Sequence, residues 1–181
     1  MRLVAAILPF VACGCLAEPE RHLIPSGYVG YIYIVFGARD GEPAVYDGHT
    51  RVYRIPRDGI LRTQLLPNLG WSWRPRHSFF FVDSASGKET TEITTEWTST
   101  IDDTDENRSD HSVGIFGRGD GVIGARISGP EDSTQVWSSE APCSVRYESY
   151  LVGTKSDVLG ATEDPFKRLD NYLRSRPLPC E

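Results

Sequence analysis

Histidine is the side chain that most often binds metal ions or transfers protons near neutral pH. The chain has four of them, His22, His49, His77 and His111, and none makes a His-x-x-x-His or His-Glu-x-x-His motif. The Gly-x-Ser-x-Gly motif that presents a nucleophilic serine is also missing. Histidines isolated in this way usually hydrogen bond locally. We therefore nominate no catalytic residue, no metal ligand and no cofactor.

Residues 119–124 match the Gly-x-Gly-x-x-Gly spacing of dinucleotide-binding loops. Such a loop needs a helix directly after it to hold the pyrophosphate, whereas residues 125–130 have the pattern of a strand and a turn. We interpret the match as coincidental. The overlapping Arg118-Gly119-Asp120 is a cell-adhesion tripeptide, but here it predicts only the tip of a hairpin between strands at 112–116 and 121–127.

An acidic loop runs from Thr100 to Asp110. Its Asp103, Asp105 and Asn107 alternate like the first ligands of a calcium loop, but Arg108 occupies the position that requires glycine. We therefore expect a solvated loop. Its negative charge at residues 102–110 would also suit a basic protein target, which leaves open a role as an inhibitor or immunity protein.

Two tryptophans alternate with basic residues in the segment from Gly70 to Arg76. Trp71 and Trp73, with Arg74 and Arg76, form a candidate platform for stacking and hydrogen bonding to a sugar or a peptide. The alternative is structural, with one tryptophan in the core and the other over a strand edge.

The N-terminus has the pattern of an export signal. Met1-Arg2 supplies a positive start, and residues 3–11 form an apolar run too short to span a bilayer. No second apolar run of spanning length follows. We assign residues 1–15 to the signal, residues 16–23 to a tether, and residues 24–181 to a single domain.

Residues 11–15 resemble a bacterial lipobox, and this resemblance implies that a cysteine receives a lipid. Cys15 is the expected attachment site because Gly14 precedes it; Cys13, or cleavage after Ala17 to release a soluble protein, stays open. Cys143 and Cys180 would then remain as a pair, which we predict to form a disulfide in an oxidising compartment.

Short strands separated by turn residues predict a mainly β domain. They are expected at 27–36, 51–55, 60–66, 77–82, 88–98, 112–116, 121–127, 134–137 and 144–152. One C-terminal helix follows, which Asp164 caps and Pro165 begins. We expect an antiparallel β-sandwich, immunoglobulin- or transthyretin-like, or a partly open barrel.

The segment at 23–30, the turn Gly41-Glu42-Pro43, and residues 51–64 occur in an order that resembles DUF6843, a family of bacterial envelope lipoproteins of unknown function. Phe81-Val82-Asp83 and residues 152–155 resemble its later landmarks. The resemblance implies export and a β-rich domain, but it carries no activity and no site residues.

The net charge of −6 and the pI near 5.3 argue against nucleic acid as a partner. We expect an exported, lipid-anchored protein facing the periplasm or the cell surface. It would act as a non-enzymatic binding or structural domain toward a protein or glycan of the envelope. An envelope hydrolase acting on polysaccharide or peptide is the first alternative, and the inhibitor or immunity protein is the second.

Overall fold

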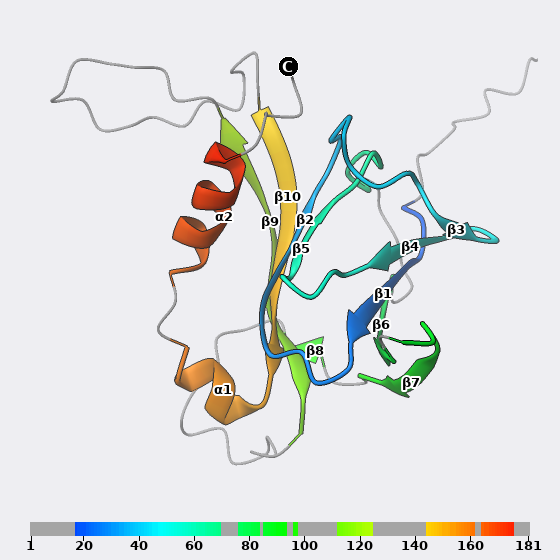
Figure 1. Cartoon of the computed structure of the whole chain (residues 1–181), viewed down its shortest axis with the longest axis vertical. Coiled ribbons are helices and arrows are strands. Elements are labelled where there is room, and N and C mark those ends of the chain that lie inside the picture. The colour runs from blue at the N-terminus through cyan, green and yellow to red at the C-terminus, as the bar shows by residue number, and fades with distance from the viewer. Residues whose placement is uncertain are drawn as a thin grey trace, which may run out of the picture.

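Two five-stranded sheets pack face to face, and two helices lie outside the second sheet (Figure 1). The computed structural model describes residues 17–69, 76–83, 85–93, 96–97, 112–124, 144–161 and 164–175. The first sheet has the order β3-β4-β1-β6-β7 and the second has the order β5-β2-β10-β9-β8. The elements are β1 Glu20–Pro25, β2 Gly30–Val35, β3 Tyr46–Asp47, β4 Thr50–Arg54, β5 Ile60–Arg62, β6 His77–Val82, β7 Glu89–Glu92, β8 Glu96–Trp97, β9 Gly114–Gly124, β10 Ser144–Gly153, α1 Lys155–Leu159 and α2 Pro165–Arg174.

The prediction of a mainly β fold is confirmed, but the sheets are mixed rather than antiparallel. Strand β1 runs parallel to both of its neighbours, β4 and β6. In the second sheet, β2, β10 and β9 are antiparallel, and β5 and β8 join the edges in parallel. Parallel strands need a long crossover connection, so partners such as β1 and β6 are far apart in the sequence and local patterns do not reveal their pairing.

The main core lies between the two sheets. Ile24 of β1, Ile32 and Ile34 of β2, and Phe79 of β6 contribute to it, all at most 2% exposed. The opposite face of β2 presents Tyr33 and Val35 to α2, whose Leu169 and Leu173 complete a second cluster. Both faces of β2 are therefore covered, as its apolar pattern predicts.

The predicted C-terminal helix is confirmed as α2, which begins at Pro165 and packs along the outer face of the second sheet (Figure 1). A second helix, α1, was not predicted. The Thr154 side chain accepts from the backbone N–H of Asp157, whose carboxylate accepts from the backbone N–H of Thr154, so this capping box fixes the start of α1. No helix among the described residues is long and apolar enough to cross a bilayer.

The segment Glu20–Leu23, which the sequence assigns to a tether, forms the first part of β1 at the centre of a sheet. Every second residue of this strand, Glu20, His22 and Ile24, points into the sandwich and is buried. Because two of these three are polar, the sequence does not show the alternation of polar and apolar residues that is typical of a strand. The expected strand at 88–98 is also divided, because β7 joins the first sheet and β8 joins the second.

The hairpin predicted around Arg118-Gly119-Asp120 is wrong, because residues 114–124 form one continuous strand, β9. Its pairing with β10 shifts register so that Gly117 and Arg118 together oppose Tyr150. Gly117 has a φ of 59°, the left-handed conformation typical of a glycine-containing β-bulge. The glycine-rich stretch therefore makes a bulged strand rather than a turn, and the bulge lies beside the site described next.

Candidate functional site

One end of the sandwich interior is polar, although its residues are as buried as the apolar core. Glu20 is 2% exposed and His22 is fully buried. Both alternate with Ile24 on the inner face of β1, and the parallel register of β1 and β6 places Glu20 beside His77. Alternation along β1 and its pairing with β6 therefore place three titratable side chains in one buried space between the sheets.

The His22 ring is held firmly by aromatic neighbours. It stacks on Phe79 at a centroid distance of 4.6 Å and lies 5.1 Å from the ring of Tyr53. Its Nδ1 atom lies 2.9 Å from the hydroxyl oxygen of Tyr150, on the opposing sheet. This hydrogen bond leaves Nε2 facing the other polar side chains.

His77 lies between the other two members of the group. Its Nδ1 atom is 2.8 Å from Glu20 Oε2 and 3.5 Å from His22 Nε2. The three atoms all lie within 4.8 Å of one another, so one ion placed among them could contact all three side chains.

Polar contacts orient both oxygens of the Glu20 carboxylate. Its Oε1 atom accepts from Asn68 Nδ2 at 2.7 Å and from the Tyr53 hydroxyl at 3.0 Å. Its Oε2 atom lies 2.8 Å from His77 Nδ1, whereas His77 Nε2 has no hydrogen-bond partner within the described part of the chain. Buried polar atoms are normally satisfied, so a buried imidazole nitrogen without a partner is unusual.

The second sheet contributes an ion pair between Arg118 of β9 and Glu148 of β10. Glu148 of β10 is 4% exposed, and Arg118 Nη1 lies 3.4 Å from its Oε1 atom. The same Arg118 nitrogen lies 3.4 Å from His77 Nδ1. The bulge at Gly117 brings Arg118 into this position, in agreement with the use of bulges to redirect side chains near functional sites.

Burial and neighbouring charges shift the pKa values of Glu20, His22 and Glu148 in different directions. For Glu20, burial raises the pKa, but the contact with His77 and the charges of both histidines outweigh it and lower the pKa to about 2. Burial lowers the pKa of His22 to about 3, so this imidazole is neutral. Burial, reinforced by the negative charge of Glu20, raises the pKa of Glu148 to about 7 despite the opposing charge of Arg118. Two carboxyl groups in one site thus differ in protonation.

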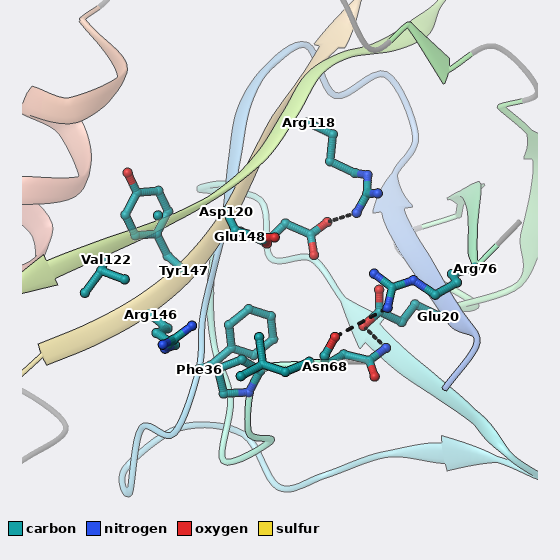
Figure 2. A pocket seen from close by; sticks show the side chains of 13 residues that line it. Glu20, Phe36, Asn68, Arg76, Arg118, Asp120, Val122, Arg146, Tyr147 and Glu148 are labelled. Atoms are coloured by element: carbon teal, nitrogen blue, oxygen red, sulfur yellow. Dashed lines mark hydrogen bonds and ion pairs between the residues drawn. The ribbon is translucent and has the colours of Figure 1, made fainter. Parts of the chain in front are cut away.

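A cavity of about 250 Å³ opens above this polar group. Figure 2 shows Glu20, Arg76 and Asn68 on one side of it, and Arg118 with Glu148 on the other. The charged lining residues comprise three arginines and three carboxylates: Arg76, Arg118, Arg146, Glu20, Asp120 and Glu148. Phe36 and Tyr147 add aromatic surface. His22 and His77 are not part of the lining.

Of the four residues proposed for the ligand platform, only Arg76 is described, and it lines the cavity. Trp71, Trp73 and Arg74 lie outside the described residues, as do Cys15, Cys143, Cys180 and the acidic loop at 102–110. The predictions made for them therefore stay predictions.

His22 and His77 are isolated in the sequence, but they lie side by side in the structure, so the expectation of only local hydrogen bonds is wrong for His22. Their proximity comes from strand pairing across 55 residues of sequence, which no helical spacing can reveal. The available signal was the period of two along each strand. Polar residues occupy the same face as a buried apolar residue: Glu20 and His22 with Ile24, and His77 with Phe79.

Comparisons with known proteins bear on family and fold. A family described as a family of unknown function, DUF6843, matches residues 17–116, which confirms the resemblance found in the sequence. No curated protein matches the chain. A 2.75 Å crystal structure of a candidate lipoprotein from Bacillus anthracis has a TM-score of 0.51 and 14% identity, covering 88% of this chain and 93% of that chain. At that identity the likeness shows the fold alone.

Proposed function

The chain belongs to the DUF6843 family, whose function is unknown, and we propose that it is a lipid-anchored envelope protein whose β domain binds a small zwitterionic molecule without transforming it. The observation that carries the proposal is the cavity, in which cationic and anionic side chains from the two sheets face one another.

Two observations support the anchor. The N-terminal residues have the composition of an export signal followed by Cys15, and the Bacillus anthracis protein of the same fold is described as a candidate lipoprotein. Several acyl chains on one cysteine would hold the domain at a membrane, at about 0.8 kcal/mol for each buried CH₂ group.

The anchor is tested by growing cells with a labelled fatty acid. The wild-type protein should carry the label and Cys15→Ser should not, while Cys13→Ser serves as the matched control and keeps it. Label on the Cys15→Ser protein, or none on wild type, would contradict the assignment.

The charges of the cavity favour a ligand that carries both signs. Arg118 and Arg76 can meet a carboxylate, and Asp120 or Glu148 can meet an ammonium group, while Tyr147 supplies a face for the carbon skeleton. The volume of about 250 Å³ suits a molecule of the size of one amino acid or one amino sugar.

Binding is tested by calorimetry with a panel of amino acids and amino sugars, with uncharged sugars as negative controls. Arg118→Gln should weaken binding by at least about tenfold, because it removes a charge-assisted hydrogen bond. Arg57→Gln changes an exposed arginine in a turn away from the cavity and should bind as wild type does. If no zwitterion binds, or if both variants bind equally, the ligand class is wrong.

A second candidate is the hydrolase alternative, which one observation favours. Glu148 and Glu20 line the same cavity with their pKa values separated, as in sites where one carboxylic acid donates a proton and the other carboxylate accepts one. Incubation with fluorogenic glycosides and peptides tests it. Turnover by the wild type that Glu148→Gln abolishes would replace the binding proposal, whereas equal background rates would leave the hydrolase without support.

A further inference from the structure

We propose that Glu20, His22 and His77 form a binding site for one divalent transition-metal ion, with Zn²⁺ as the best match. This inference goes beyond the proposed binding function and does not depend on it, because only Glu20 belongs to both sites.

The spacing of the three ligand atoms fits such an ion. Two ligands of a tetrahedral zinc ion at 2.0–2.1 Å from the metal are about 3.3 Å apart. The 3.5 Å between His22 Nε2 and His77 Nδ1 is close to this value. The 2.8 Å between His77 Nδ1 and Glu20 Oε2 requires the carboxylate oxygen to withdraw by about half an ångström.

The surroundings of the three side chains resemble the outer sphere of a metal site. The Tyr150 hydroxyl contacts His22 Nδ1 and leaves Nε2 for the ion. The Tyr53 and Asn68 side chains donate to Oε1 of Glu20, which leaves its Oε2 directed at His77 Nδ1, 2.8 Å away. Partners of this kind fix the tautomer and the orientation of metal ligands.

The donor set selects the class of metal. Two imidazoles and one carboxylate suit Zn²⁺ and its first-row neighbours, whereas Ca²⁺ and Mg²⁺ prefer oxygen ligands alone. Three protein ligands leave a fourth position for water or a small ligand.

Arg118 opposes the ion in the present arrangement, because its Nη1 atom lies 3.4 Å from His77 Nδ1. The same nitrogen lies 3.4 Å from Glu148 Oε1. Metal binding therefore requires Arg118 to leave the imidazole while it keeps its contact with Glu148.

The test uses the full-length protein, treated with a chelator and then titrated with Zn²⁺ in a calorimeter. Wild type should bind one ion that His77→Gln and Glu20→Gln lose. His49→Gln and Glu92→Gln replace exposed residues of the same types and should retain it. Because the variants keep all four cysteines, any zinc bound by thiols is the same in every sample.

Two further measurements decide the outcome where a ligand variant is poorly folded. Tyr150→Phe keeps the packed ring, removes only the hydroxyl beside His22, and should weaken Zn²⁺ binding by about 10- to 100-fold. Co²⁺ should give the visible absorption of a four-coordinate nitrogen–oxygen site, which a thiolate site does not share. The proposal is overturned if wild type binds no Zn²⁺, or if Tyr150→Phe, His77→Gln and Glu20→Gln all bind it as tightly as wild type.

Discussion

Replacing Gly117 with alanine tests whether the bulge in β9 is a requirement of the fold. Gly117 has a φ of 59°, and an alanine held in this left-handed conformation costs about 1–2 kcal/mol. No atom lies within 4 Å of the added Cβ, so steric collision contributes nothing. The entropy lost from the unfolded chain offsets about 0.4–1 kcal/mol. The net loss in the free energy of unfolding should be about 1 kcal/mol.

Gly119 supplies a matched control two residues along the same strand. It is exposed, its φ is not positive, and a Cβ there also meets nothing within 4 Å. Because the unfolded-state effect is the same in Gly117→Ala and Gly119→Ala, the difference between them isolates the backbone strain, about 1–2 kcal/mol. Urea denaturation followed by circular dichroism measures it. Two variants of equal stability would refute the assignment of a strained bulge.

Three further outcomes are expected. Leu169→Ala, which removes the fully buried contact of α2, should cost about 2–5 kcal/mol in urea denaturation, whereas Leu159→Ala at a half-exposed position should stay within about 0.5 kcal/mol. Because its folded pKa of about 7 exceeds the unfolded value of 4.5, Glu148 contributes stability that is complete below pH 4.5 and lost as pH rises through 7, up to about 3 kcal/mol. Glu148→Gln should remove that part of the pH dependence, and a curve identical to wild type would contradict the pKa. Thr154→Ala should cost about 1 kcal/mol by removing the cap of α1, and a melting temperature equal to wild type would argue against the capping box.

The parts of the fold that sequence predicted well are those whose signal is local. The alternating aromatic and aliphatic residues of β2 and the capped, one-sided pattern of α2 both correspond to elements of the structure. Each can be recognised from about ten residues of sequence, because its apolar side chains repeat with the period of a strand or a helix.

The parts that sequence missed depend on partners far away in the chain. The charges of Glu20 and His22 concealed β1, since their burial is tolerable only after His77 and Tyr150 arrive from β6 and β10. Glycines predicted a turn in β9, whereas the bulge opposite Tyr150 uses one of them inside a strand. The candidate site was missed for the same reason, because its members meet only through pairing between strands.

The start of β1 at Glu20 limits how far the domain can stand from a bilayer. If Cys15 carries the lipid, four residues separate it from Glu20, and the five extended steps from Cys15 to Glu20 reach at most about 18 Å. The cavity that Glu20 lines would then lie at the membrane-proximal end, close to the lipid head groups. Its ligands would be sampled from the thin aqueous layer next to the bilayer.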